Sequence, residues 1–328
     1  MYDIFDMQSS DYDSIIDRTG FDPGKLDSEA ADQHFAVLDE QRQIRARCSV
    51  WWRDTAPVDG EQSGAIGHYA ATDERFGAVA LEYACRELGN RRCKFAVGPL
   101  DGNTWRRYRF ITERGTARPF FLEPDNPDEY PVHFERSGFR QLATYVSETN
   151  PAMATRQPEL GSLRDKMDAL GIHIRSLNAE VPNDDLDGVY DVVTESFKSS
   201  FLYTPLDRES YRSMYIPLLK AVDPRLMLVA IRDGEVVGFV FAPPDVLQQS
   251  YQDSVDAIVI KTIAILPRKE LSGLGRVLIV DMLQNAIDMG FTTAISALMH
   301  TGNRSQQISS DCAGPMRGYA LFAKDVQS

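Results

Sequence analysis

The chain has 328 residues, of which 43% are hydrophobic and 25% are charged, an ordinary composition with apolar material for two cores of about 150 residues each. No apolar run reaches the ~18 residues of a membrane span, and the first residues lack the basic and apolar regions of a secretory signal. A net charge of −13 repels nucleic-acid phosphates and anionic membranes and favours a cationic or neutral substrate. We therefore expect a cytoplasmic protein with a small-molecule substrate and no nucleic-acid or membrane partner.

The first half of the chain opens with an acidic lead-in and continues as a mixture of strands and a helix. Residues 1–40 contain 11 acidic and 2 basic side chains, and we take residues 1–30 as the lead-in. A strand–turn–strand pattern, a third strand, a helix and a further strand follow. These elements are expected at residues 35–52, 65–71, 75–88 and 93–97.

The second half repeats this order about 190–200 residues later. Asp233-Gly234 is a strong two-residue hairpin signal within the strand pair. The expected elements are a hairpin at 227–241, a strand at 257–266, a helix at 273–289, and strands at 293–299 and 317–323. Strands that alternate with helices predict an α/β protein, each half being a mixed, mostly antiparallel sheet flanked by helices.

The weak repeat predicts two homologous domains, at residues 31–150 and 166–328. The polar segment that begins at Asn150 carries Pro151 and Pro158, so we expect a linker over residues 151–165.

Neither the cysteines nor the histidines are spaced as metal ligands. The cysteines form no Cys-x-x-Cys pair, and the histidines form no His-x-His or His-x-x-x-His pair. In a reducing compartment such cysteines are free, buried thiols. The sequence therefore predicts no metal site. The residues concerned are Cys48, Cys85, Cys93, Cys312, His34, His68, His133, His173 and His300.

The segment 262–279 carries the most specific chemical signal. A strand ends at Pro267, and Gly273 and Gly275 then open a helix with apolar residues at helical spacing. The first turn of a helix has unpaired N–H groups and a positive dipole end, and glycines let a diphosphate approach the backbone closely. The pattern is neither a dinucleotide fingerprint, since no third glycine follows, nor a Walker A loop, since no Gly-Lys-Ser/Thr follows. Tight strand–helix packing is the alternative role of the glycines.

This stretch resembles motif A of the GNAT acetyltransferase superfamily, in which a strand of the form V-x-P precedes Q/R-x-x-G-x-G/A. The matching residues are 265–267 and 270–275, and the resemblance covers about residues 171–325. It implies that the backbone amides of the turn hold the pyrophosphate of acetyl-CoA or another acyl-CoA. The implied cofactor-binding residues are Ile263, Ile265, Arg268, Leu271, Ser272, Gly273, Leu274, Gly275, Arg276 and Asn303.

The sequence departs from the family pattern at two positions. Glu270 stands where the family has glutamine or arginine, and an acid beside a diphosphate is unfavourable unless it points away. Arg268 or Lys269 then takes the cationic role. Ser310 stands where many relatives have a tyrosine that acts as general acid.

The first half resembles a degraded copy of the same domain. Residues 72–78 retain one glycine and carry acids in place of the Gly-x-Gly turn, so we expect no CoA there. Two loops rich in aromatic residues and arginine, at 98–110 and 119–131, are candidates for part of an acceptor pocket, or for packing between the halves.

The resemblance implies direct acyl transfer in a ternary complex, with a backbone N–H near Ile265 meeting the oxyanion. His300 follows the strand beside the predicted CoA strand, and its ordinary pKa suits a general base. Tyr319 is a candidate proton donor if its strand lines the cleft, with packing as the alternative for both residues. Asp256 and Cys312 are weaker candidates.

These observations favour an acyl-CoA-dependent N-acyltransferase with a small amine acceptor. Two alternatives remain open. One is acyl transfer to a thiol or carrier protein, or thioester decarboxylation, on the same fold. The other is a non-catalytic acyl-CoA-binding interaction protein, because a fold by itself does not select among these functions.

Overall fold

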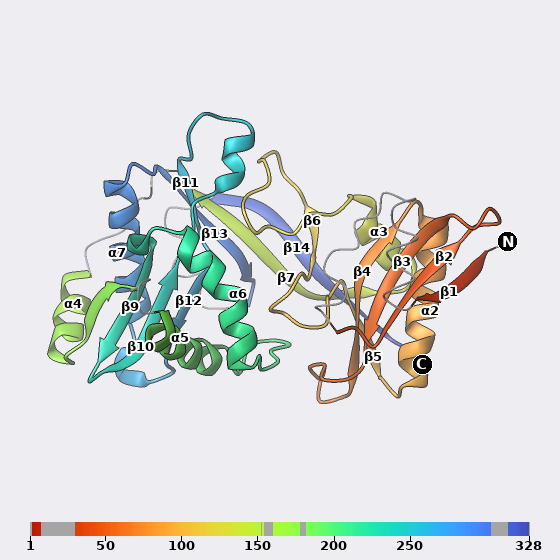
Figure 1. The fold of residues 1–328 in the computed structure, drawn as a ribbon, viewed down its shortest axis with the longest axis horizontal. Coiled ribbons are helices and arrows are strands. Elements are labelled where there is room, and N and C mark those ends of the chain that lie inside the picture. The colour runs from red at the N-terminus through yellow and green to blue at the C-terminus, as the bar shows by residue number, and fades with distance from the viewer. Residues whose placement is uncertain are drawn as a thin grey trace.

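The computed structural model describes residues 2–7, 30–151, 153, 160–177, 182–302 and 314–327. The chain forms two lobes that lie side by side along the long axis of the molecule (Figure 1). One lobe is built mainly from the first half of the sequence and the other mainly from the second.

The first lobe is the N-terminal part of a ten-stranded sheet. Asp73 caps helix α2, since its carboxylate accepts the N–H of Phe76 at 3.0 Å, and the apolar face of α2 is buried. This lobe contains β1 (Asp3–Met7), β2 (Gln33–Leu38), β3 (Ile44–Trp51), β4 (Ser63–Ala71), α2 (Glu74–Asn90), β5 (Phe95–Gly98), β6 (Phe110–Glu113) and α3 (Glu129–Arg136).

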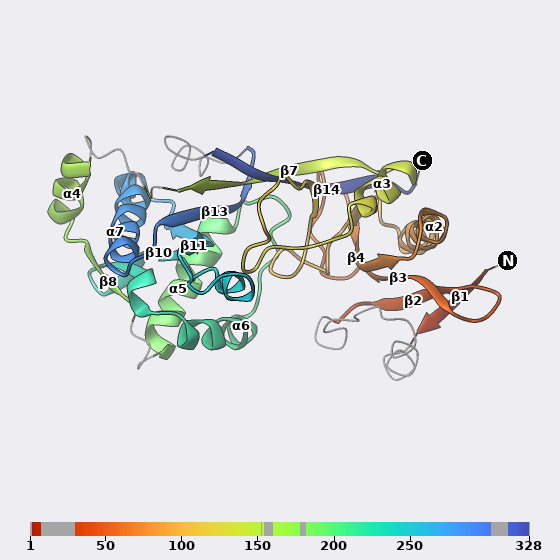
Figure 2. The same ribbon diagram turned by 90° about the horizontal axis from the view of Figure 1, so that it is seen from above.

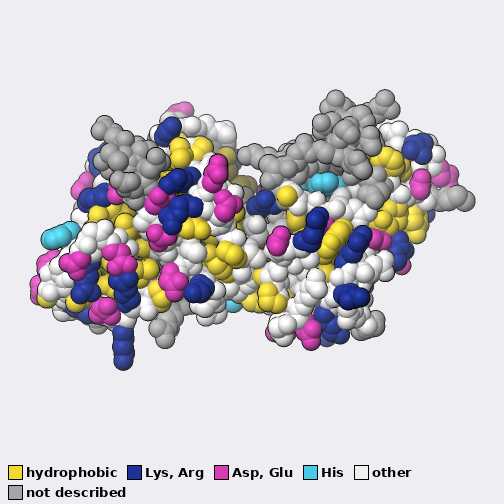
Figure 3. Space-filling model, turned by 60° about the horizontal axis from the view of Figure 1, so that its bottom comes forward, with side chains coloured by type: hydrophobic (Ala, Val, Ile, Leu, Met, Phe, Trp, Pro, Cys, Tyr) yellow, Lys and Arg dark blue, Asp and Glu magenta, His cyan; other side chains and the backbone are white. Residues whose placement is uncertain are grey.

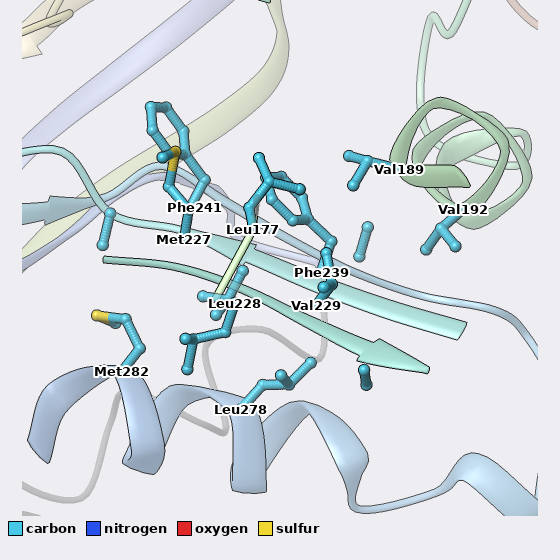
Figure 4. Close-up of a cluster of buried hydrophobic side chains, with 14 of the residues drawn as sticks. Leu177, Val189, Val192, Met227, Leu228, Val229, Phe239, Phe241, Leu278 and Met282 are labelled. Atoms are coloured by element: carbon cyan, nitrogen blue, oxygen red, sulfur yellow. The ribbon is translucent and has the colours of Figure 1, made fainter. Parts of the chain in front are cut away.

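The second lobe contains a separate four-stranded sheet, in the order β12-β10-β9-β8. Helices α5 and α7 cover opposite faces of this sheet, with Val189 and Val192 on one side and Leu278 and Met282 on the other (Figure 4). The elements of this lobe are α4 (Leu160–Ala169), β8 (His173–Ser176), α5 (Pro182–Phe197), α6 (Arg208–Ala221), β9 (Met227–Arg232), β10 (Glu235–Phe241), β11 (Ala257–Ile260), β12 (Thr262–Ile265), α7 (Leu274–Asp288) and β13 (Thr293–His300).

Two long strands, β7 (Arg140–Asn150) and β14 (Gly314–Asp325), join the lobes. The larger sheet runs in the order β1-β2-β3-β4-β5-β14-β7-β13-β11, with β6 paired to β14. The last strand of the sequence therefore pairs with β5 of the first lobe, and β7 pairs with β13 of the second. Both strands run from one lobe to the other (Figures 1 and 2).

The strand expected at 257–266 changes sheets at Lys261. Before it, β11 pairs in parallel with β13, from Ala257↔Thr293 to Ile260↔Ser296. After it, β12 pairs with β10 of the smaller sheet. Because β12 and β13 then belong to different sheets, they diverge and leave a wedge between them.

The predicted fold class, a mixed sheet flanked by helices in each half, is confirmed, and each predicted strand and helix is present within a few residues. Asp3–Met7 forms an edge strand inside the predicted lead-in, and α4 begins at Leu160 inside the predicted linker. Cys48, Cys85 and Cys93 are buried free thiols. We keep the division into two domains near residue 150 as a proposal, with β7 and β14 shared between the halves.

Within the described ranges, no helix combines the length and the apolarity that crossing a membrane requires. Basic and acidic side chains are interspersed over both lobes on the face shown in Figure 3.

Candidate functional site

A cavity of about 1240 Å³ fills the wedge where β12 leaves β13. One wall belongs to the second lobe and includes Lys261–Ile263 of the switching strand, residues 296–300 of β13, and Arg276 and Val280 of α7. The facing wall includes residues 104–109 and 122–124 of the first half, together with the segment 199–201 after α5. Both halves of the chain therefore contribute to one site.

The expected glycine turn stands at the N-terminus of α7. Gly273 is the N-cap in a left-handed conformation (φ +98°), and no side chain caps the helix there. The N-cap residue, a glycine, therefore offers no side-chain acceptor to the first-turn N–H groups of α7, as suits an anion-binding helix start. A Cβ at Gly275 would lie 3.3 Å from Ile263 Cδ1, so this glycine lets α7 pack closely on β12.

The outer edge of β12 is available to a ligand. Leu266 N–H donates to the Val237 carbonyl, and antiparallel pairing alternates, so the N–H groups of Ile263 and Ile265 point away from β10. On that side no strand of the described ranges pairs with β12 in its sheet. The backbone of the predicted Ile263 and Ile265 is therefore placed to hydrogen-bond an extended ligand.

The structure brings only part of the predicted cofactor set to the cavity. Ile263 and Arg276 line it. Arg268 instead forms a bidentate ion pair with Glu235, at 2.5 and 2.7 Å. Leu271 is buried in the core, and Ser272 is exposed beside the turn. Asn303, like Ser310 and Cys312, lies outside the described residues.

The structure shows where two charged side chains near the turn lie. Glu270 points to Arg232, with 3.7 Å between Oε1 and Nη1, so this acid is partly neutralised. A cation near the turn is supplied by helix α4, which lies outside the sequence motif. Lys166 of α4 donates from Nζ to the Ser272 carbonyl at 2.7 Å, which places an ammonium beside the N-terminus of α7.

His300 lines the cavity at the end of β13, with its ring edge-on to Tyr145 at 5.1 Å. Its Nδ1 accepts the Gly302 N–H at 3.0 Å, so the neutral ring carries its proton on Nε2. Burial lowers the pKa of His300, and the Arg109 charge lowers it further. In this neutral form Nδ1 is already occupied and Nε2 carries the proton, so the geometry favours His300 as a hydrogen-bond donor over the predicted general base.

Tyr319 is fully buried in β14 and is not among the residues that line the cavity. Its hydroxyl donates to Glu123 and contacts Ser147 Oγ at 3.0 Å. Glu123 also pairs with Arg317, at 2.7 Å between Oε1 and Nε. Burial raises the pKa of Tyr319, and the neighbouring Glu123 carboxylate raises it further. The contacts of Tyr319 are those of a residue that holds β14, β7 and the segment around Glu123 together.

Tyr319→Phe should therefore act on stability. Removing a hydroxyl that donates to a buried carboxylate costs about 1–3 kcal/mol, so Tm should fall while acyl-transfer rates stay within a few-fold. Thermal unfolding and steady-state rates measured on the same preparation check this. A loss of rate with unchanged Tm would instead support the predicted proton donor.

The sequence did not identify Arg109 and Lys261 as site residues, although both line the cavity. Arg109 is 5% exposed and donates from Nη1 to the Leu298 carbonyl at 3.0 Å. Its guanidinium carbon lies 3.7 Å from the ring centre of Tyr108 and 4.0 Å from that of Tyr145. Lys261 is half-buried at the point where the strand changes sheets. In the sequence, Lys261 is marked only by being a charged residue within an otherwise apolar strand pattern.

The two aromatic loops of the first half both reach the cavity and also pack between the halves. Trp105 Nε1 donates to the Thr204 carbonyl at 2.8 Å, and Leu122 and Glu123 line the cavity from the second loop. By contrast, the corresponding helix start in the first half, at α2, already has a carboxylate on its N–H groups, because Asp73 caps it. A carboxylate in that position occupies the place of an anion.

Comparisons with known proteins address the fold. No family model and no curated protein matches the sequence. A GCN5-related N-acetyltransferase from Sphaerobacter thermophilus superposes with a TM-score of 0.53 at 15% identity, over 99% of this chain and 96% of that one. A tandem GNAT protein from the clavulanic acid biosynthesis pathway, solved without AcCoA, gives 0.54 at 9% identity, over 99% of each chain.

A glucosamine N-acetyltransferase region in a fungal multi-domain GH3 β-N-acetylglucosaminidase gives a TM-score of 0.55 at 13% identity. The match covers 99% of this chain and 38% of that protein. At these identities the likeness concerns architecture. The divergent strands, the glycine turn before α7 and these superpositions agree, and the chain has a tandem GNAT-type fold.

Proposed function

We propose that the chain is an acyl-CoA-dependent N-acyltransferase that uses a small amine acceptor. The observation that supports this proposal is the wedge cavity. It is lined by the first turn of α7 and the free edge of β12 in the second lobe, and by loops of the first lobe. GNAT-type neighbours support acyl transfer as the class of reaction.

The residues present fit an acyl-CoA. The first turn of α7, with Lys166 and Arg276 beside it, would hold the diphosphate, and the edge of β12 would hold the amides of the pantetheine arm. A bound acyl-CoA supplies a thioester carbon, on which the acceptor nitrogen replaces sulfur to give an amide and the CoA thiol.

At the end of the cavity away from the diphosphate, side chains of the protein have three roles. His300 presents Nε2–H as a hydrogen-bond donor. Tyr145 and Phe201 pack around its ring, at 5.1 and 6.0 Å between ring centres, and fix its orientation. The loop of residues 104–109 closes the facing wall, which orients the acceptor and limits water.

Calorimetric titration with acetyl-CoA tests the proposal. We expect one site per chain, and we expect Arg276→Glu to weaken binding by about 10–100-fold, because a charge-assisted contact to phosphate is replaced by repulsion. Arg225→Glu, at an exposed arginine paired with Asp223, is the matched control and should bind normally.

Two other results would change the conclusion. Two sites per chain would show that the first copy also binds CoA. Unchanged affinity in the Arg276 variant would contradict the placement of the diphosphate. Once binding is established, thiol release over a panel of amines and thiols identifies the acceptor class, and binding without turnover on either panel would favour an interaction protein.

A further inference from the structure

The charge of the cavity is opposite to that of the chain. The whole sequence has 48 acidic and 35 lysine or arginine residues, yet among the described residues that line the cavity the basic ones outnumber the acidic ones by five to one. Glu123, the acid among the described residues of the lining, is already engaged by Arg317 and Tyr319. The cavity therefore favours a ligand that carries an anionic group, which the net charge of the chain does not predict. The basic lining residues are Arg106, Arg107, Arg109, Lys261 and Arg276.

Arg109 is a buried cation without a carboxylate partner in the described part of the chain. Two tyrosine rings and one carbonyl hold it in place, and its Nε has no hydrogen-bond acceptor there. Rings and a carbonyl orient a guanidinium but do not neutralise it. A buried charge of this kind is costly unless an anion meets it.

Lys261 faces the same cavity and likewise has no ion-pair or hydrogen-bond partner among the described side chains. Burial lowers the pKa of Lys261 to about 8, and the Arg109 charge contributes to this shift. Arg109 also lowers the pKa of His300. The charge of Arg109, from the loop of the first lobe, therefore acts on both Lys261 of the switching strand and His300 of β13.

The position of Lys261 separates this cluster from the diphosphate. Lys261 precedes Leu266 by five residues, which is about 16 Å along an extended strand, and the glycine turn lies beyond Leu266. The cluster is therefore at the thioester end of the cavity, where acceptor and acyl group meet.

We propose that Arg109 and Lys261 form a carboxylate-binding site at the thioester end of the cavity, and that the acceptor is an amine that itself carries a carboxylate, such as an amino acid. This inference rests on the proposed function. The guanidinium and the ammonium bind the carboxylate and hold the amine nitrogen toward the thioester carbon. The cavity thereby excludes amines that lack an anionic group, because they leave both cations unpaired.

The test measures binding of product-like probes without turnover. N-Acetylglycine and N-acetylphenylalanine are titrated into the protein, with and without CoA, beside their uncharged carboxamides. We expect the acids to bind about tenfold or more tightly than the amides and to raise Tm of the parent protein. Lys261→Met should remove this preference, and Arg109→Gln should do the same if it folds. Arg225→Gln, at the exposed arginine paired with Asp223, should retain it.

A second comparison locates the carboxylate. Malonyl-CoA and acetyl-CoA are titrated into the parent and into Lys261→Met. A preference for malonyl-CoA that disappears in the variant would support the anion site but overturn its assignment to the acceptor. Acids and amides that bind equally, with acetyl-CoA still bound, would overturn the carboxylate site and leave the transferase proposal standing. Absence of any acyl-CoA binding would overturn the transferase proposal, whatever the probes do.

Discussion

Gly273→Ala should weaken acyl-CoA binding. Gly273 occupies φ +98°, where an L-residue is strained by about 1–2 kcal/mol, and its new Cβ would lie 2.5 Å from Leu163 Cδ2 of α4. The Leu163 side chain can rotate away from this contact, so the effect comes from the backbone strain, which a shift of the first turn of α7 relieves and which displaces the N–H groups that would hold the diphosphate. We expect an affinity loss of about tenfold or more in an acetyl-CoA titration.

Gly290→Ala is the matched control for this variant. Gly290 follows the C-terminus of the same helix at φ +93°, and a Cβ there would meet nothing within 4 Å. It should lower Tm through the same backbone strain and leave acetyl-CoA affinity unchanged. If both variants bind acetyl-CoA as tightly as the parent protein, the diphosphate does not lie at the start of α7.

The glycine turn could be predicted because its signal is local. A strand that ends at Pro267, a short polar turn and a helix with apolar residues at helical spacing lie within about 25 consecutive residues. Each element follows from propensity and periodicity, and their order places the helix start at the end of the strand. The structure has α7 at Leu274–Asp288, within a residue of the predicted bounds.

The pairing of β7 and β14 could not be predicted in the same way. The stretch 317–323 reads as a strand in the sequence, but nothing in it specifies β5 and β7, more than 160 residues away, as its neighbours. Register and partner choice depend on which faces are buried in the assembled sheet. A division of the chain by sequence position therefore missed the exchange of strands between the halves.

The cluster of Arg109 and Lys261 could not be predicted for the same reason. Arg109 and Tyr145 belong to the first half and Lys261 and Leu298 to the second, and only the shared strand β7 beside β13 brings them together. The sequence marks residues 98–110 as a candidate acceptor loop, but nothing in it distinguishes Arg109 from the other arginines of that loop. The side chains of Arg268 and Glu270 were equally unpredictable, because their partners Glu235 and Arg232 come from a hairpin about 35 residues earlier.

Lys261→Met should stabilise the unliganded protein, the second large effect that we expect. Burial lowers the pKa of Lys261 to about 8 in the folded protein, against about 10.4 in an unfolded chain. Below pH 8 the residue is protonated in both states, so the folded protein bears the full cost of a desolvated ammonium. A methionine of similar length removes that cost, and at pH 7 we expect a gain of about 1–3 kcal/mol and a Tm higher by a few degrees.

The gain should depend on pH with a defined sign. Between pH 8 and about 10.4 the unfolded state binds more protons at Lys261 than the folded state, so the parent protein gains stability relative to Lys261→Met as pH rises. The difference between the two proteins should therefore shrink across this window in thermal melts from pH 7 to 10.5. Lys261→Arg, which stays charged, should show no gain at any pH in the series.

Loss of stability in Lys261→Met at pH 7 would contradict the premise that the ammonium lacks an anion within the protein. A gain, together with loss of the preference for carboxylate probes, would show that this position trades stability for ligand binding. Such a trade is expected where a charge is held ready for a substrate, because the substrate's own charge completes the pair. The negative net charge of the chain then belongs to its surface, and the positive charge of the cavity lining is available to bind the substrate's carboxylate.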